Sequence, residues 1–390
     1  MDREPLISVI TTVYNNERYI TNAVNSVVNQ GFDDYEYIII DDGSTDNTPE
    51  IVERLAEANP KIRVIHQKNQ WIYASFNNGI ALARGKYVFI LNSDDILEKG
   101  ALELFKNKIE EYNFPDVIWT QVIPCICDEE QKIIKYDAWN RVGLLRGEEF
   151  FRNRTEVRTA WPYFVKARLT VDQANLYKRE IIKGFKFRTN IIGADSFFNL
   201  DIASQINTAL VIKEVVYIFY IYSDGKMNAS EGSYFEYQKK MNDDLLNKYL
   251  ELFESWGLNP DIYEEVMCEM RLRTMTREIR GLKSINCRMS TLEKIKTVMI
   301  HNMDENLLKL VDRTNKRNEL ESRTLNGLAD ILKDEQIDRE SEMGFVYDLV
   351  DFVPRMGYTP PIQLTINDTN LNYAINNPLN PAQIGRESLL

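Results

Sequence analysis

Strand-like and helix-like segments alternate along roughly the first hundred residues, and this alternation limits the possible folds more than any other feature. Residues 6–15 and 35–40 are rich in β-branched side chains, which favour strands. Between them, apolar residues recur at helical spacing from Ile20 to Val28, and Glu17 is expected in the first turn of that helix. Strands that alternate with helices in this way predict a parallel sheet covered by helices on both faces.

The alternation continues through two further steps. Residues 48–58 open with Thr-Pro-Glu, which is typical of a cap followed by a proline in the first turn of a helix. A third strand is predicted over 61–67, a third helix over 72–85 and a fourth strand over 86–91. The polar loops that follow these strands should therefore meet at one edge of the sheet.

Polar pairs stand at the carboxyl ends of three of the predicted strands. These pairs are Tyr14-Asn15, Asp41-Asp42 and Asp94-Asp95. An isolated Asp-Asp before a helix is explained equally well as a helix cap. Ligands of open α/β sheets, however, bind beyond the carboxyl ends of the strands, and all three pairs occupy such ends. The placement therefore predicts that residues scattered in sequence converge on one site.

The pattern becomes mixed after residue 112. A strand is predicted near 116–123, an irregular aromatic stretch over 128–170, a helix over 193–204 and a closing strand over 214–223. We expect a first domain over residues 1–233, a smaller helical domain over 234–352 and an extended tail rich in proline and asparagine over 353–390.

Composition sets the outer limits. With 390 residues, 44% of them hydrophobic and 27% charged, the chain should fold as more than one domain. A formal net charge of −12 argues against a nucleic-acid partner, which needs a basic face. The four cysteines fit neither a zinc site nor a redox pair and are expected to be reduced. A cytoplasmic protein is expected, and peripheral association with the inner face of the membrane stays open.

Several ordered motifs resemble the inverting family 2 glycosyltransferases, which have the GT-A fold. The motifs lie between about residues 5 and 225 and are ISVITTVYN, DDGSTD, NQ separated by five residues from FNNGIALARGKY, NSDD and ANLYKREIIKGFKFRTNIIGADSFF. The resemblance implies an α/β, Rossmann-like, mostly parallel sheet flanked by helices and followed by a helical C-terminal domain.

The resemblance also implies how a nucleotide-sugar donor is held. Thr12, Tyr14, Asn15 and Asn77 would line the donor pocket. Asp42 would hydrogen-bond the base, usually uracil, and a fixed carboxylate that accepts from a base N–H does give such selectivity. The alternative is that DDGSTD forms only an Asx-type turn with helix caps, as Asp46 and Thr48 in the same motif would do in part.

NSDD corresponds to the family's metal motif. The implied roles are Asp94 towards the ribose or the metal and Asp95 as direct ligand of Mn²⁺ or Mg²⁺. Hard carboxylate oxygens suit such ions, which neutralise the charge on a departing diphosphate. A bound cation would also explain how two adjacent carboxylates tolerate each other.

GADSFF corresponds to the segment that carries the family's catalytic base, which would be Asp195. A carboxylate in the first turn of a helix is held ionised by the helix N-terminus, as a base near neutral pH requires. The structural alternative is an aspartate that only stabilises the helix.

Four positions differ from the usual family residues. Thr12 replaces a proline, Asn92 an acidic residue of the metal motif, Ala194 the acidic partner before the base and Trp71 a glycine. The last strand also lacks a histidine that many relatives place near the metal, and Tyr222 is the nearest candidate. His66 is interpreted as a packed or capped side chain rather than a ligand.

The implied activity is an inverting, metal-dependent hexosyl transfer from a nucleotide-sugar donor, UDP-linked, to a carbohydrate or glycoconjugate acceptor in bacterial surface polysaccharide synthesis. The alternative is a catalytically inactive sugar-nucleotide-binding or scaffold protein of the same fold. A dehydrogenase is disfavoured because no G-x-G-x-x-G follows the first strand. A homo-oligomer formed through the helical domain stays open. Trp139 or Trp161 could stack on a sugar, although burial in the core is the better default for such aromatics.

Overall fold

The computed structural model describes residues 4–136, 147–171, 173–222, 233–302 and 305–333. The chain divides into two compact units, Met1–Asn228 and Ala229–Leu390. The expected tail over 353–390 lies outside the described residues. The domain limits at 233 and 352 stay predictions.

The first four strands of the main sheet are parallel and are separated by helices, as the alternating sequence pattern predicts. Their order in the sheet is β3-β2-β1-β4. The elements are β1 (Ile7–Val13), α1 (Ile20–Val28), β2 (Tyr35–Asp41), α2 (Thr48–Ala58), β3 (Ile62–His66), α3 (Ile72–Leu82) and β4 (Tyr87–Ile90). The carboxyl ends of these strands therefore lie at one edge.

The rest of the sheet mixes strand directions. An antiparallel strand, β9, lies between β4 and β6, and β6 runs parallel to β10. The remaining strands β5, β7 and β8 pair antiparallel. The fold class is confirmed as α/β, but the parallel direction is confined to β3-β2-β1-β4 and to the pair β6/β10. The later elements of this unit are β5 (Ile96–Leu97), α4 (Ala101–Glu111), β6 (Val117–Cys127), β7 (Ile133–Tyr136), β8 (Glu149–Phe151), α5 (Arg154–Lys166), β9 (Asn175–Lys178), α6 (Arg179–Ile182), α7 (Ala194–Ile202), a 3₁₀ turn (Ala203–Gln205) and β10 (Ala209–Tyr222).

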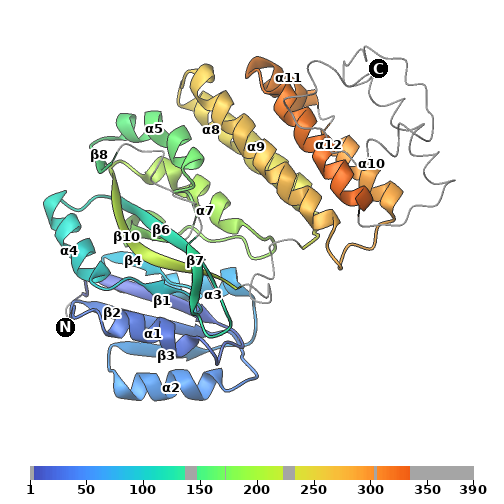
Figure 1. Cartoon of the computed structure of the whole chain (residues 1–390). Helices are drawn as coiled ribbons and strands as arrows, with labels where there is room; N and C mark the ends of the chain where they lie inside the picture. The colour runs from blue at the N-terminus through green and yellow to red at the C-terminus, as the bar shows by residue number, and fades with distance from the viewer. Residues whose placement is uncertain (1–3, 137–146, 172, 223–232, 303–304, 334–390) are drawn as a thin grey trace, which may run out of the picture. The chain divides into compact units, whose positions relative to one another are not determined.

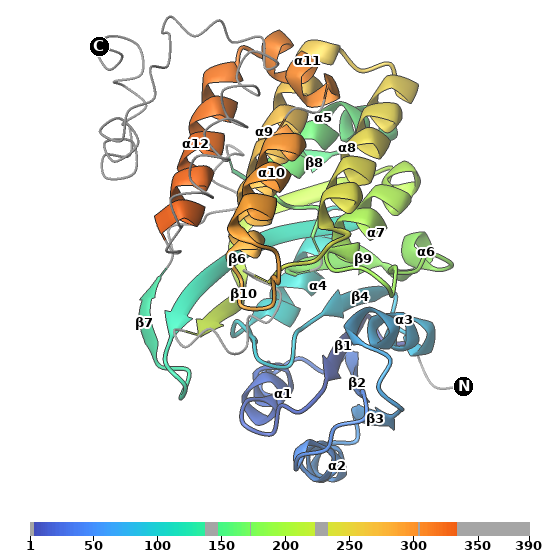
Figure 2. The same cartoon turned by 90° about the vertical axis from the view of Figure 1, so that its right-hand side faces the viewer.

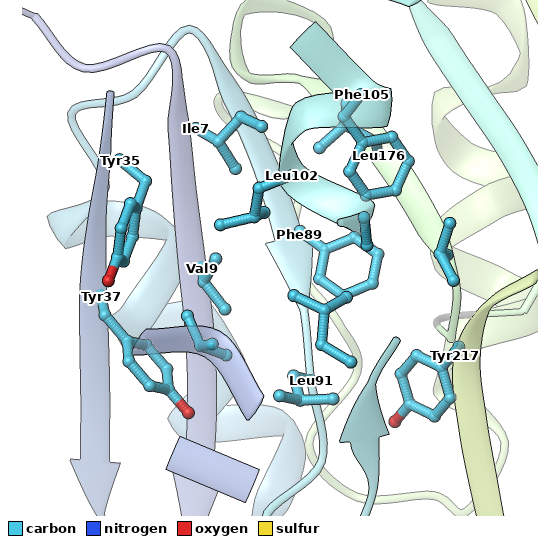
Figure 3. Packing of buried hydrophobic residues seen from close by; sticks show 14 of the residues in the cluster. Ile7, Val9, Tyr35, Tyr37, Phe89, Leu91, Leu102, Phe105, Leu176 and Tyr217 are labelled. Atoms are coloured by element: carbon cyan, nitrogen blue, oxygen red, sulfur yellow. The ribbon is translucent and has the colours of Figure 1, made fainter. Parts of the chain in front are cut away.

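Successive side chains of β1 point to opposite faces of the sheet, and both faces are covered by helices. Ile7 and Val9 belong to the cluster that includes buried residues of α1, α2 and α4, and Figure 3 shows them beside Phe89 and Leu102. On the other face α3 approaches so closely that a Cβ on Gly79 would lie 2.5 Å from Cγ2 of Ile10. Helix α3 is therefore fixed tightly against the strands whose ends carry the predicted site.

Two local expectations were wrong. Helix α1 begins at Ile20, so Glu17 lies before the helix and not in its first turn. The Glu17 carboxylate instead accepts hydrogen bonds from the backbone N–H and the side-chain amide of Asn47. The stretch 128–170 is not irregular throughout, since it contains β7, β8 and α5. Its helix is capped by Asn153, whose side chain accepts from the N–H groups of Thr155 and Glu156.

The second unit is helical over its described residues. Its helices are α8 (Gln238–Ser255), α9 (Pro260–Leu282), α10 (Thr291–Asn302), α11 (Glu305–Arg313) and α12 (Arg317–Lys333). Helix α9 packs against the other four. A polar cluster is buried in this unit: Arg271 lies 3.3 Å from both Asp243 and Glu278, and the Asn242 side chain donates to Glu278 at 2.7 Å. None of the described helices combines the length and the hydropathy that spanning a bilayer requires.

Candidate active site at the carboxyl edge of the sheet

Hydrogen bonds tie together the loops that follow β1, β2 and β4. The side-chain oxygen of Asn15 accepts from the N–H of Thr45 at 2.7 Å. The side-chain amide of Asn16 donates to the Ser93 hydroxyl at 2.9 Å. The predicted gathering of Tyr14-Asn15, the DDGSTD loop and the NSDD loop is therefore present at this edge.

Asp42 is buried beside the loop that follows β3. Its Oδ1 accepts from the side-chain amide of Gln67 at 2.7 Å and from the backbone N–H of Gln70 at 2.9 Å. The neighbouring Gly43 has φ 79°, and a Cβ there would lie 2.8 Å from the backbone N of Asn69. No other described residue hydrogen-bonds Oδ2 of Asp42, so one carboxylate oxygen is left for a ligand.

Asp41, the other aspartate of this pair, serves the structure of the loop. Its carboxylate accepts from the N–H of Ser44 and lies 2.7 Å from Nδ1 of His66, whose Nε2 lies 2.8 Å from Glu53. The hydrogen bond to Asp41, with a second to Glu53, raises the pKa of His66. His66 is thus held between two carboxylates, in agreement with its interpretation as a capped side chain.

Asp94 and Asp95 differ in their surroundings. Asp95 is fully buried, and its carboxylate accepts from the Tyr217 hydroxyl at 2.7 Å, the backbone N–H of Tyr220 at 2.9 Å and the side-chain amide of Asn92 at 3.0 Å. Asp94 is only half buried, and no other described residue donates a hydrogen bond to its carboxylate. Of the two, Asp94 is the carboxylate that is open to a ligand.

Burial raises the pKa of both aspartates, and the Asp94 charge raises that of Asp95 further. Such a pair favours a bound cation, which would offset the repulsion. Within the described ranges, no three His, Cys, Asp or Glu side chains are grouped as a metal site. Of this pair, the Asp94 carboxylate has the free acceptor capacity that a hard divalent ion needs. The role of Asp95 as a metal ligand stays a prediction.

Thr12 and Tyr14, which are predicted to line the donor pocket, lie at the same edge. Thr12 is 6% exposed near the end of β1, whereas Tyr14 is 50% exposed. Tyr222, the candidate to replace the absent histidine, is buried and its hydroxyl accepts from the Gln131 amide at 2.9 Å. The same Gln131 amide donates to the backbone carbonyl of Asp94 at 2.8 Å. Through Gln131, Tyr222 is therefore linked to the backbone of the NSDD loop.

Both ends of the Asn77 side-chain amide are hydrogen-bonded to the backbone of Phe187. Its side-chain nitrogen donates to the carbonyl of Phe187 and its oxygen accepts from the N–H of Phe187, both at 2.8 Å. This pair of bonds fixes the segment before α7 to helix α3. The role of Asn77 in donor binding stays a prediction, and its contacts favour a structural role.

Asp195 lies in the first turn of α7, as the sequence predicts. The N–H of Gly193, just before the helix, donates to the Tyr73 hydroxyl of α3 at 3.0 Å. The Phe187 ring stacks on Phe198 of α7 with centroids 4.1 Å apart and on Tyr73 with centroids 5.6 Å apart. Helix α3 thus holds the start of α7, and Figure 2 shows both helices in the first unit. The role of Asp195 as base stays a prediction.

Sequence reasoning missed the residues that position the site. Gln67 and Gln70 hold Asp42, and Tyr217 and Tyr220 hold Asp95 from a strand more than a hundred residues away. No local sequence pattern predicts hydrogen-bond partners that are so far apart in the chain. Trp161 is fully buried, with its ring centroid 5.9 Å from that of Trp119, so it belongs to the core. Trp139 lies outside the described residues.

Comparison with known proteins gives a consistent result. Residues 8–182 match the family described as Glycosyl transferase family 2. The glycosyltransferase GlyG of Streptococcus pneumoniae serotype 4 is 36% identical over 114 residues, which are 29% of this chain and 38% of GlyG. The chondroitin synthase of Escherichia coli is 42% identical over 104 residues, which are 27% of this chain and 15% of that protein. The chain thus matches less than two thirds of either relative.

Among solved structures, TarS residues 1–349 of S. aureus, crystallised with UDP-GlcNAc, resembles this chain with a TM-score of 0.59. The two are 17% identical, and the match covers 84% of this chain and 90% of that one. At this identity the likeness establishes a shared fold.

Proposed function

The chain belongs to glycosyltransferase family 2 through residues 8–182, and from this premise we propose that it transfers a sugar from a UDP-linked donor to an acceptor hydroxyl with inversion. The fold is of the GT-A type. The acceptor is proposed to be a growing polysaccharide or glycoconjugate, because the relatives include a chondroitin synthase.

One observation carries the proposal. The loops after β1, β2 and β4 are joined by hydrogen bonds, and at this edge two carboxylate groups keep free acceptor capacity, Oδ2 of Asp42 and the carboxylate of Asp94. A base with an N–H edge at one carboxylate and a diphosphate with its cation at the other is the ligand that matches both. A sugar nucleotide contains both parts.

The proposed metal site uses Asp94 rather than Asp95 as the direct ligand. Both carboxylate oxygens of Asp95 accept hydrogen bonds from protein donors, so Asp95 is proposed to position the loop. A divalent cation, when bound, would neutralise the charge that develops on the departing nucleoside diphosphate.

Asp195 is proposed as the base. It takes the proton of the acceptor hydroxyl while that oxygen forms a bond to the anomeric carbon, and the bond from this carbon to the diphosphate oxygen breaks. A single displacement inverts the configuration. The contacts of Tyr73 and Phe187 with the start of α7 would hold the carboxylate in place for this step.

A uridine nucleotide is the proposed donor. The TarS structure of the same fold contains UDP-GlcNAc, which supports this choice. The test is a screen of UDP- and GDP-sugars for nucleotide release, with and without Mn²⁺. Release from a UDP-sugar only with the metal is expected. Binding of UDP without any release would instead support the alternative, a sugar-nucleotide-binding or scaffold protein.

Asp195→Asn tests the base. The variant should lose transfer while its Kd for UDP stays unchanged, because asparagine keeps the size of the side chain but cannot accept the proton. Asp201→Asn, an exposed position on the same helix, is the matched control and should keep full activity. Normal turnover in Asp195→Asn would remove this residue from the mechanism.

The membrane-face location and the homo-oligomer stay proposals. Vesicle sedimentation and sedimentation velocity of the full chain, respectively, test them.

A further inference from the structure

Trp71 adopts a backbone conformation that residues other than glycine rarely adopt. Its φ is 76° and its ψ 159°, directly before helix α3. This region is populated almost only by glycine, and a bulky residue stays there only when its surroundings enforce it. Yet the indole is not buried as a core side chain would be, since Trp71 is 45% exposed.

Contacts on both sides pin the backbone of Trp71. The preceding N–H, of Gln70, donates to Oδ1 of Asp42 at 2.9 Å. The carbonyl of Trp71 accepts from the N–H and the hydroxyl of Ser75 at 3.1 and 3.2 Å. The strained residue is thus the link between the carboxylate proposed to bind the base and the first turn of α3. Trp71 directly follows Gln70, the residue whose N–H contacts Asp42.

A second exposed aromatic ring lies on the other side of Asp42. Tyr14, 50% exposed, follows β1, Asp42 follows β2, and Trp71 belongs to the loop that follows β3. Strand β2 lies between β1 and β3 in the sheet. At this edge, therefore, the carboxylate with a free oxygen comes from the central loop, and an exposed ring comes from each flanking loop.

This arrangement has the chemical features that a nucleobase needs. The edge of a base carries N–H groups that a carboxylate accepts, and its two π faces stack on aromatic side chains. We propose that Trp71 stacks on the base of the bound nucleotide while Oδ2 of Asp42 accepts from its edge, with Tyr14 on the side of β1. The proposal rests on the proposed function and adds to it a base-binding residue that this chain has in place of the family's glycine.

The test compares UDP binding by the full chain and by Trp71→Gly. Glycine accepts φ 76° without strain, so the variant should fold with an unchanged or raised thermal midpoint. Its Kd for UDP should rise about tenfold, the range expected for loss of a stacked ring. Trp71→Phe keeps a ring and should show a smaller rise. UDP should also quench tryptophan emission in the unmodified protein and much less in Trp71→Phe.

Phe114→Gly is the matched control. Phe114 is also an exposed aromatic residue with positive φ, at 61°, but it precedes β6 at the opposite edge of the sheet. This variant should bind UDP normally.

The outcomes separate this inference from the proposed function. An unchanged UDP Kd in Trp71→Gly, with sugar transfer intact, would overturn the stacking role and leave the transferase. A raised KM for the acceptor with an unchanged UDP Kd would assign the indole to the acceptor and also overturn the proposal. Failure of the unmodified protein to bind UDP would overturn both.

Discussion

Asp94 and Asp95 are adjacent in sequence but are expected to respond oppositely to mutation. Asp95→Ala leaves the Tyr220 N–H and the Tyr217 hydroxyl without their acceptor, which costs about 1–3 kcal/mol for each buried donor left unpaired. Asp94→Ala removes a half-buried charge that no other described residue pairs, so it should leave the free energy of unfolding equal or higher while metal-dependent UDP binding falls. Urea unfolding followed by the fluorescence of the buried Trp119 and Trp161, together with calorimetry with UDP and Mn²⁺, measures both effects. The reverse pattern would return the role of metal ligand to Asp95.

His66 should titrate above its ordinary pKa of about 6.5, because Asp41 and Glu53 both favour the imidazolium. A folded pKa above the unfolded one gives stability that is fully present below about pH 6.5 and is lost as the pH rises through the folded value. The stability difference between the protein and His66→Gln should therefore shrink towards alkaline pH. Only two histidines are present, so NMR titration resolves the one that disappears in the variant. A pKa below 6.5 would contradict the prediction.

The individual site residues were only partly predictable. Asp42, Asp94 and Tyr14 stand at strand ends, and the rule for parallel sheets places such ends together. Which carboxylate of a pair stays open could not be read from the sequence, because it depends on Tyr217 and Tyr220, contributed by β10.

Helix α3 is the element that couples the donor side of the site to α7. Its first residues follow the loop that holds Asp42, and its Tyr73 and Asn77 hold the segment that leads to Asp195. The closeness of Gly79 to Ile10 keeps α3 from shifting on the sheet. The two halves of the proposed reaction, donor binding and proton removal, are thus placed by one rigid helix.

Tyr73→Phe isolates this coupling. The ring and its stacking on Phe187 remain, and the hydroxyl that accepts from the N–H of Gly193 is lost. A net loss of about 1 kcal/mol for one hydrogen bond corresponds to about a fivefold lower kcat, with the KM for the donor unchanged. Steady-state kinetics beside a thermal melt checks it. An equal fall in kcat with a raised donor KM would indicate a general disturbance of the fold.

At the level of elements, the alternating first hundred residues were predicted well because each strand and helix there has a clear hydrophobic period. Helix α5 was missed, since Pro162 and scattered aromatics hide its period. The available signal was the cap at its start, where Asn153 and Glu156 hydrogen-bond each other, three residues apart. The antiparallel β9 between β4 and β6 could not be foreseen, because insertion of a strand depends on distant partners.

In the molecule as a whole, every residue proposed to contact the donor or take the proton belongs to the first unit. The second unit is stabilised in part by the buried Arg271, with Asp243 and Glu278 as partners. Although burial acts against it, the pKa of Glu278 is lowered by His301 and Arg271. Loss of one partner from such a cluster leaves an unpaired buried charge.

Arg271→Ala should therefore destabilise the second unit by about 3–5 kcal/mol and leave UDP binding by the first unit intact. Hydrogen exchange separates the two, because peptides of α9 should lose protection while those of β1 keep it. Lys309→Ala removes a surface pair with Glu305 in the same unit and should change little. Protection lost equally in both units would show that they unfold together.

The unusual backbone at position 71 has a consequence for laboratory evolution. Conformational strain of this kind costs about 1–3 kcal/mol, a large share of the roughly 5–15 kcal/mol that holds a typical protein folded. A library randomised at this codon and screened only for heat tolerance should enrich glycine over alanine and serine. The same library screened for turnover at low donor concentration should keep tryptophan, so the two screens would drive one codon in opposite directions.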